Sequence, residues 1–218
     1  MARRDPPFLS IPCLVLVTDR TLCGEAALTE KVAEAVEGGV NVVQLREKDL
    51  PDEKLLPLAQ ALREVTSGKA LLIINGPAEI AQAVQADGVH LPEAAPPAQE
   101  ARRLLAKGSI VGRSAHSVAG ARRAQEEGAD YVQLGSVFPT RSHPGVPPAG
   151  LALIEDAAKA VDIPIVAVGG ITAENIGSVL AAGAKGCAVI SAILGSERPR
   201  ETAQRLRGAI MEWEAKRK

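Results

Sequence analysis

The segment EGGVNVVQL at residues 37–45 recurs in altered form three more times along the chain. The later copies are QADGVHL at 85–91, EGADYVQLG at 127–135 and AGAKGCAVI at 182–190. Each copy ends a helical stretch at a small residue or glycine and then enters a short, mostly apolar run. The copies introduce every second apolar run, so the repeat unit is two strand–helix pairs. Alternate strands fill alternate layers inside a (β/α)8 barrel, and the repeat therefore favours a closed barrel.

Eight short apolar runs alternate with helix-period segments from one end of the chain to the other. Runs such as LLII at 71–74 and PIVAV at 164–168 are too continuous for strands with one exposed face. We predict one α/β domain, a (β/α)8 TIM barrel spanning 1–218, with a core at about 12–195 and a C-terminal helix at about 199–216. A doubly wound open sheet is the alternative. The predicted strands are Cys13–Val17, Val40–Leu45, Leu71–Ile74, Gly88–Leu91, Ile110–Ser114, Tyr131–Gly135, Ile165–Val168 and Gly186–Val189.

Four of the intervening segments have clear helical periodicity. Ser117 and Thr172 stand near two helix starts in the manner of N-caps, and Glu174 falls in a first turn. The predicted helices are Glu53–Val65, Ala98–Ala106, Ala119–Glu126 and Glu174–Ala181.

The composition excludes several classes of function. The 218 residues carry 25 Lys and Arg against 26 Asp and Glu, a net charge of −1, so no bulk charge attracts nucleic acid or an anionic membrane. Only four aromatic residues are present, too few for a base-stacking surface. Cys13, Cys23 and Cys187 follow no disulfide or zinc pattern. Without a signal segment or a long apolar run, we expect a cytoplasmic protein that binds a small molecule, with a homodimer left open.

Polar residues gather where the predicted strands end, which is where barrel enzymes place their active sites. Gly169 and Gly170 follow the seventh strand, and Ile190 and Ser191 follow the eighth. Loops after these two strands often bind phosphate through backbone N–H groups, so we predict a phosphate site there. A tight turn that merely needs glycine at positive φ is the alternative.

Arg46 and Lys48 follow the second strand, and strand alternation sends both toward the barrel mouth. A guanidinium and an ammonium group there favour binding of a phosphate or carboxylate. A solvated cluster of ion pairs with Glu47 and Asp49 is the alternative.

The three histidines differ in their predicted roles. His116 follows the fifth strand beside Ser114, where an imidazole can move protons at the mouth. His90 lies within the fourth strand, which is typical of a hydrogen-bonded core histidine. His143 lies in PTRSHPGVPP at 139–148, a long Pro- and Gly-rich loop that resembles a lid.

As a set, these residues resemble the thiamine phosphate synthase superfamily, which also contains the TenI-type thiazole tautomerases. The likeness runs from about Val15 to Ile193 and is closest to the TenI-type branch. The segments that carry it include LVTDR at 16–20, VVQLREK at 42–48, ADYVQLGSVFPTRS at 129–142 and IPIVAVGGIT at 163–172.

The resemblance implies two ligand subsites. Gly170, Ile190 and Ser191 match positions that hold a thiazole phosphate, together with the hydroxyl groups of Thr140 and Ser142. A second set matches positions that hold the pyrimidine pyrophosphate of the synthase: Gln44, Arg46, Lys48, Asn75 and Ser114. His143 replaces a lysine of the phosphate loop and is counted among the substrate-binding residues.

The sequence departs from the synthase pattern at the magnesium ligands. Gly76 and Ala95 stand where that pattern has carboxylates, and neither Glu79 nor Glu93 lies at a matching position. No metal site is therefore predicted, and Mg²⁺ is expected only for a synthase.

These departures favour a metal-free TenI-type thiazole tautomerase, an isomerase with His116 as its acid and base and no cofactor. The alternatives are a thiamine-phosphate synthase, which is a transferase that uses Mg²⁺, and a non-catalytic regulator that binds thiazole phosphate.

Overall fold

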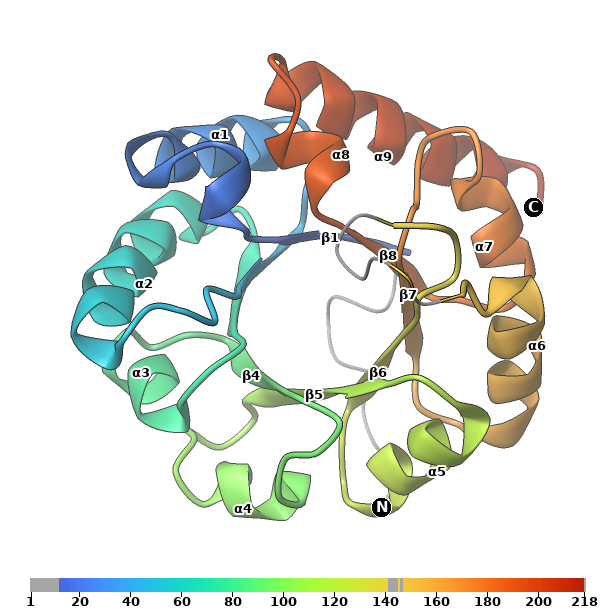
Figure 1. The fold of residues 1–218 in the computed structure, drawn as a ribbon, viewed down its shortest axis with the longest axis horizontal. Coiled ribbons are helices and arrows are strands. Elements are labelled where there is room, and N and C mark those ends of the chain that lie inside the picture. Colours follow the sequence, from blue (N-terminus) through green and yellow to red (C-terminus); the bar gives the residue numbers. More distant parts are fainter. Residues whose placement is uncertain (1–11, 141–144, 146, 218) are drawn as a thin grey trace.

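The computed structural model describes residues 12–140, 145 and 147–217. Its eight strands are parallel and form a closed barrel in chain order, with β8 paired to β1. The view down the barrel in Figure 1 shows the strands as an inner ring surrounded by helices. The predicted (β/α)8 barrel is confirmed, and a closed ring excludes the doubly wound sheet. The strands are β1 Cys13–Val17, β2 Val42–Leu45, β3 Leu71–Ile74, β4 Gly88–Leu91, β5 Ile110–Ala115, β6 Tyr131–Leu134, β7 Ile165–Val168 and β8 Gly186–Val189.

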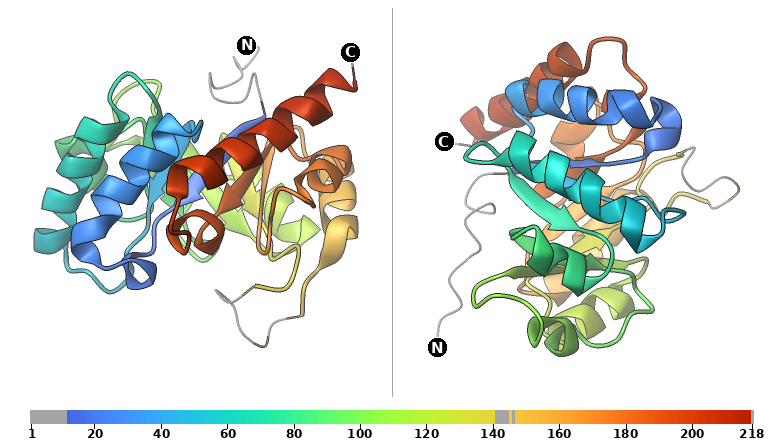
Figure 2. Two further views of the ribbon diagram at one scale, coloured as in Figure 1. Left: turned by 90° about the horizontal axis from the view of Figure 1, so that it is seen from above. Right: turned by 90° about the vertical axis from the view of Figure 1, so that its left-hand side faces the viewer.

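The helices cover the outside of the barrel, and the C-terminal helix closes the ring against α1. Figure 2 shows α9 and α1 lying side by side over one flank. Lys31 Nζ of α1 donates to the carbonyl oxygens of Leu194 and Ser196 at 2.8 Å each, just before α9 begins. The helices are η2 Arg20–Leu22, α1 Glu25–Glu37, α2 Asp52–Thr66, α3 Ala78–Ala83, α4 Ala98–Arg102, α5 Val118–Glu126, α6 Gly150–Ala160, α7 Ile176–Ala181, α8 Ser191–Leu194 and α9 Pro199–Ala215.

Two helix boundaries differ by two residues or more from those predicted. Ser117 does cap α5, since its Oγ accepts from the N–H of Gly120 at 3.0 Å. Thr172 caps nothing, because α7 begins only at Ile176. Asn175 instead bridges the preceding turn, which leaves Glu174 outside the helix. Helix α4 ends at Arg102 rather than Ala106.

Side chains alternate between the barrel interior and the helices. In β1, Cys13, Val15 and Val17 point into the barrel, whereas Leu14 and Leu16 pack under the helices. Both faces are buried, which explains the continuous apolar runs. The buried thiols of Cys13 and Cys187 also behave as small core residues, and burial raises the pKa of the Cys13 thiol to about 12.

The interior residues form levels of four, each drawn from alternate strands. Gln44 lies opposite Ile73, which lies opposite Gly88, and the stagger of the barrel brings His90 to the height of Gln44. The same steps continue through β6 and β8 and return to β2. We call this level the amide level; it consists of Gln44, His90, Gln133 and Ala188. The level nearer the mouth consists of Val17, Asn75, Ser114 and Val168.

Tyr131 fills the interior below the amide level. Its ring lies where a side chain on Gly112 would be, since a Cβ there would come within 2.1 Å of Tyr131 Cζ. Tyr131 is 3% exposed, so the barrel is filled beneath the mouth. A ligand can therefore reach the interior residues only from the carboxyl ends of the strands.

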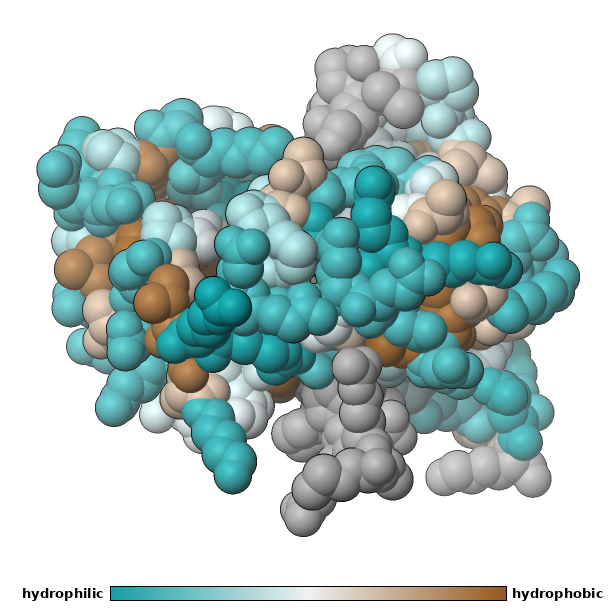
Figure 3. Space-filling view, turned by 90° about the horizontal axis from the view of Figure 1, so that it is seen from below, coloured by the Kyte–Doolittle hydropathy of each residue, from teal (hydrophilic) through white to brown (hydrophobic). Residues whose placement is uncertain are grey.

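The surface offers few large apolar groups. Among the described residues, the exposed large hydrophobic side chains are Leu22, Leu104 and Met211, on separate elements. On the face shown in Figure 3, apolar residues appear in areas separated by hydrophilic ones. In the described part of the chain, no helix combines the length and apolarity required to cross a bilayer.

Candidate functional site

A cavity opens at the carboxyl ends of β6, β7 and β8. Its wall includes Val168 and Ala188 from the barrel interior and His116 from the end of β5. The remaining lining residues come mainly from three loops: Gly135, Ser136, Thr140, Gly169, Gly170, Ile171, Val189, Ile190, Ser191 and Ala192. All four predicted phosphate-binding residues therefore border one cavity.

Backbone shape requires glycine after β7. Gly169 has φ +107° and Gly170 has φ +62°, both in the left-handed region. A Cβ on Gly170 would also lie 2.5 Å from the carbonyl oxygen of Pro139. Asn175 fixes this turn, because its Nδ2 donates to the Gly170 carbonyl at 2.9 Å while its Oδ1 accepts from the Thr172 N–H. The glycines thus serve the tight turn and also border the cavity.

Several backbone N–H groups around this cavity lack protein acceptors. Within the described residues, none accepts from the N–H of Gly170, Ser191 or Ala192. Such donors are satisfied by water or by an anion. We call Gly169, Gly170, Ile190 and Ser191 the backbone half of the mouth.

Polar side chains from β2, β3, β5 and β6 face the barrel interior around the rest of the mouth. Gln44 and Gln133 come from the amide level, Asn75 and Ser114 from the level above, and Arg46 follows β2. We call these five residues the side-chain half of the mouth. The barrel therefore brings together residues that are almost 90 positions apart in the sequence.

Arg46 supplies a positive charge to the side-chain half. In the described part of the protein its guanidinium has no hydrogen bond or ion pair with another side chain. Its positive charge contributes to the lowered pKa of His90. Lys48 is exposed and likewise makes no ion pair with a described residue. The arrangement suits an anionic group at the mouth.

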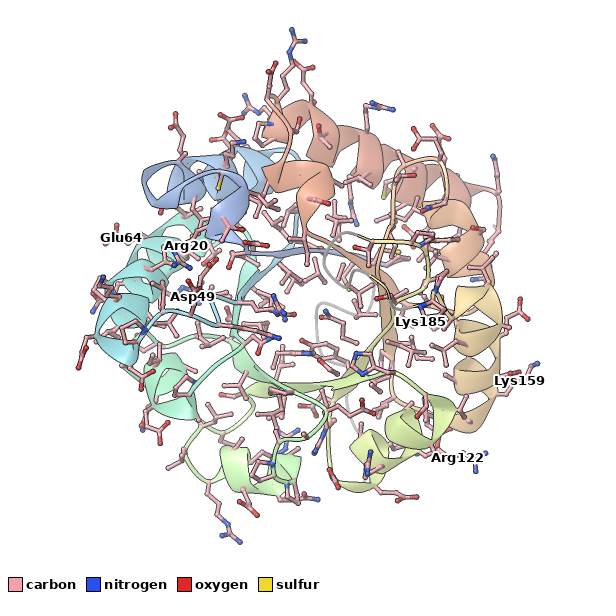
Figure 4. All side chains as sticks on the ribbon, in the orientation of Figure 1. Arg20, Asp49, Glu64, Arg122, Lys159 and Lys185 are labelled. Carbon is pink, nitrogen blue, oxygen red and sulfur yellow. The ribbon has the colours of Figure 1, made fainter. Side chains whose placement is uncertain are left out.

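Arg20 holds the loop that carries Arg46 and Lys48. It forms two hydrogen bonds of 2.6 Å to the Asp49 carboxylate, and its Nη1 also donates to Glu47 Oε2 at 3.2 Å. The side chains of Arg20 and Asp49 point toward one another in Figure 4. Glu47 further accepts from the Arg20 backbone N–H, and Thr18 Oγ1 accepts from the Arg46 N–H at 2.9 Å. The acidic residues therefore pair with Arg20, and the predicted cluster with Arg46 and Lys48 does not form.

His90 is a buried, hydrogen-bonded core histidine, as the sequence predicted. Its Nδ1 lies 3.0 Å from the Tyr131 hydroxyl and its Nε2 lies 2.9 Å from Ser114 Oγ. Burial, followed by the positive charge of Arg46, lowers the pKa of His90 to about 3. A neutral imidazole therefore connects Tyr131 to Ser114, and the amide level carries no charged side chain.

His116 lies at the rim of the cavity with its side chain 58% exposed. Its Nδ1 is 2.6 Å from Glu93 Oε2, and the other oxygen of Glu93 lies 3.9 Å from Arg123. The Glu93 carboxylate orients the imidazole of His116, and His116 forms part of the cavity wall.

The described side chains do not fit a magnesium site. No group of three or more His, Cys, Asp or Glu residues in this part of the chain is arranged to hold a metal ion. Gly76 and Ala95 offer no ligand, and Glu93 is engaged by His116 and Arg123. Glu79 is exposed on α3.

Two predicted residues, Ser142 and His143, lie outside the described residues. The sequence did not single out the roles of Arg20 and Gln133. The signal for Gln133 is present in the internal repeat, because VVQL at 42–45 aligns with YVQL at 131–134 and so pairs Gln44 with Gln133. No local signal identifies the role of Arg20, whose partners lie 27 and 29 residues away.

Comparison with known proteins identifies the family. The profile of the TMP-TENI family, described as thiamine monophosphate synthase, matches residues 14–193. The chain belongs to this family. It is 41% identical over 210 residues to the thiamine-phosphate synthase of Roseiflexus sp. (strain RS-1), covering 94% of this chain and 89% of the relative. It is 45% identical over 199 residues to the thiamine-phosphate synthase of Methanoculleus marisnigri, covering 90% of this chain and 94% of that one.

A solved structure of the same family has the same barrel. The thiamine phosphate pyrophosphorylase from Pyrococcus furiosus superposes with a TM-score of 0.83 at 37% identity, covering 92% of this chain and 96% of that chain.

These relatives correct the expected activity. The superfamily assignment and its link to thiamine biosynthesis are supported, but the assignment to a TenI-type tautomerase is wrong, and so is the class of isomerase. The relatives are named as synthases, which are transferases. The departures at Gly76 and Ala95, on which the tautomerase prediction depended, are two positions, whereas the similarity to the synthases extends over most of the chain.

Proposed function

We propose that the protein is a thiamine-phosphate synthase that joins a pyrimidine pyrophosphate to a thiazole phosphate. The observation that carries this proposal is the presence of two anion-binding groups in one mouth. They are the guanidinium of Arg46 and the N–H groups of Gly170 and Ser191, none of which has an acceptor among the described residues. A reaction between two phosphorylated substrates needs both. The names of the relatives support the same activity.

In the proposed complex, the thiazole phosphate occupies the backbone half, with Thr140 beside it, and the family resemblance assigns Ser142 and His143 to the same subsite. The pyrimidine pyrophosphate occupies the side-chain half, where Arg46 and Lys48 hold the pyrophosphate with Asn75 and Ser114. The carbon–oxygen bond to the pyrophosphate breaks, and a bond from the same carbon to the thiazole nitrogen forms. Positive charge near the departing oxygens stabilises the transition state.

His116, which the sequence predicted as the acid and base of an isomerase, has a binding role in this proposal. The coupling forms a carbon–nitrogen bond without moving a proton, so the imidazole at the rim serves as a hydrogen-bonding group for the thiazole phosphate. The described side chains do not fit magnesium. We therefore propose that Arg46 and Lys48 stabilise the negative charge on the departing pyrophosphate, and we route no step through a metal. We also propose a cytoplasmic location, which is consistent with three free cysteines.

The test is a coupling assay with the full chain and both substrates, with and without added divalent cations. We expect thiamine phosphate and pyrophosphate to form in equal amounts. Arg122→Ala on α5 is the control, because Arg122 is exposed and distant from the mouth (Figure 4). Binding of both ligands without product under every condition would reject the synthase and leave a phosphate-binding regulator.

A further inference from the structure

A buried arginine behind the barrel wall holds the loop between β4 and α4. Strand alternation directs Arg113 of β5 away from the barrel interior, and its side chain is 4% exposed. Its Nη2 donates to the carbonyl oxygen of Glu93 at 2.9 Å and to that of Ala95, and its Nη1 donates to that of Pro96 at 3.3 Å. The guanidinium also pairs with the Glu127 carboxylate at the end of α5.

The loop at 92–97 depends on these hydrogen bonds for its path. Its sequence is PEAAPP, and its three prolines have no backbone N–H to donate. Within the loop, the Ala95 N–H donates to the Pro92 carbonyl oxygen at 3.1 Å. Carbonyl oxygens that leave water need donors, and a guanidinium offers five N–H groups in fixed directions. Arg113 therefore supplies the loop with donors that its own sequence lacks.

Glu93 connects this loop to the cavity. Its carbonyl oxygen accepts from Arg113, while its Oε2 lies 2.6 Å from Nδ1 of His116, which lines the cavity. Its Oε1 lies against the first turn of α5, where a Cβ on Gly120 would collide with it. The backbone of Glu93 is thus fixed behind the barrel wall, and its carboxylate is fixed against a ring at the mouth.

We propose that Arg113 is a positioning residue for the thiazole phosphate subsite and acts through Glu93 on His116. Arg113 is not among the described residues that line the cavity, whereas His116 is. An ionised carboxylate only accepts hydrogen bonds, so the contact with Glu93 keeps a proton on Nδ1 of His116 and fixes the plane of the ring. The inference rests on the proposed function, since it concerns the ring assigned to bind the thiazole phosphate.

A purely structural role for Arg113 predicts a different result. Loss of the guanidinium would then lower stability, and any loss of binding would occur whether or not His116 is present. If Arg113 acts through His116, its removal has no effect on binding once the imidazole is gone. A double-mutant cycle separates the two roles.

Arg102 of α4 provides a matched control. It also donates to two carbonyl oxygens, those of Ser109 and Gly128 at 3.1 Å each, and pairs with the Asp130 carboxylate. These partners precede β5 and β6, so they lie at the end of the barrel away from the mouth. Arg102→Met removes the same kind of interaction without touching the loop at 92–97.

The first measurement needs no ligand. Correlations between ring protons and ring nitrogens in NMR spectra identify which nitrogen of a neutral histidine carries the proton. At about pH 8, we expect the proton of His116 on Nδ1 in the wild type and in Arg102→Met, and a mixture of both tautomers in Arg113→Met. Arg113→Lys keeps a positive charge beside Glu127, which protects folding, and should show a smaller change in the same direction because lysine lacks the planar fork.

The second measurement is the dissociation constant for the thiazole phosphate, obtained by calorimetry without the second substrate. We expect Arg113→Met to raise this constant by about fivefold and His116→Ala to raise it by about tenfold. The variant with both substitutions should match His116→Ala. Arg102→Met should bind as the wild type does.

Three results would overturn the proposal: an unchanged proton position on His116 in the Arg113 variants, an unchanged dissociation constant, or the same fivefold loss when Arg113→Met is added to His116→Ala. Neither measurement requires coupling. A chain that forms no thiamine phosphate but shows both expected changes rejects the synthase and retains the assignment of Arg113. Normal coupling with neither change does the reverse.

Discussion

The two halves of the mouth recognise anions by different means. The backbone half offers N–H groups whose directions are set by glycines at positive φ and by Asn175. The side-chain half offers a guanidinium, amides and a hydroxyl on rigid strands. Recognition by backbone depends on the path of the chain and tolerates many side chains, whereas recognition by side chains depends on residue identity. Substitutions should therefore affect the two substrates separately.

Arg46→Ala should have the largest effect. It removes the positive charge of the side-chain half, and we expect kcat/KM for the pyrimidine pyrophosphate to fall by about 10²–10³-fold. The KM for the thiazole phosphate should stay within about twofold of the wild-type value, since Arg46 belongs to the other half of the mouth. Steady-state kinetics with each substrate varied in turn measures both. Equal losses of affinity for the two substrates would contradict the division of the mouth.

Gly170→Ala should affect the opposite half. A Cβ there meets the Pro139 carbonyl oxygen at positive φ, so we expect the free energy of unfolding to fall by about 1–3 kcal/mol. The KM for the thiazole phosphate should rise about tenfold, because the turn must shift its N–H groups. The KM for the pyrimidine pyrophosphate should change little.

Gly108→Ala is the matched control for that substitution. Gly108 has φ +97°, a Cβ at this position would meet no described atom within 4 Å, and the residue lies away from the mouth. It should lose stability through backbone strain while both KM values remain normal. If Gly108→Ala raised the KM for thiazole phosphate as much as Gly170→Ala, the effect would reflect stability alone.

The neutrality of His90 in the amide level can be tested by pH. The pKa of His90 is about 3 in the folded protein and about 6.5 when exposed, so below pH 6.5 only the unfolded chain takes up this proton. The contribution of neutral His90 to the free energy of unfolding is complete above pH 6.5 and is lost as the pH falls toward 3. We expect His90 to account for a loss of about 2 kcal/mol of unfolding free energy between pH 7 and pH 5.

Urea unfolding at both pH values measures this contribution. The pH dependence should be weaker by that amount in His90→Asn than in the wild type. Parallel pH profiles for His90→Asn and the wild type would show that His90 is charged in the folded state.

Asp49→Asn should have the smallest effect. The pKa of Asp49 is lowered to about 2 by its hydrogen bonds to Arg20, yet its side chain is 65% exposed. Exposed ion pairs contribute little to stability, and Glu47 still holds Arg20 from a buried position. We expect kcat/KM to change by less than about twofold at pH 7. A larger loss, measured in the same coupling assay, would make Asp49 essential for placing Arg46.

The sequence predicts the barrel well because parallel strands buried on two faces leave continuous apolar runs. It also locates Arg46, Gly170 and Ser191, since the ends of barrel strands meet at one mouth. The sequence does not predict which side chains form hydrogen bonds when they lie far apart along the chain. Nothing local to Glu47 indicates Arg20, and Thr172 resembles a cap until Asn175 forms the turn. The predicted activity is also wrong, because two missing carboxylates say less about the reaction than a family resemblance that extends over most of the chain.

The packing of Tyr131 against Gly112 has an evolutionary consequence. The phenol ring occupies the volume of the missing side chain, and its hydroxyl is held by His90, so the ring cannot move aside. A larger residue at position 112 is compatible with this barrel only when position 131 becomes smaller. Among related sequences, we therefore expect a larger residue at position 112 to occur together with a smaller residue at position 131. A lineage that reversed the pair would lose the phenol that supports His90 and would need another way to orient Ser114.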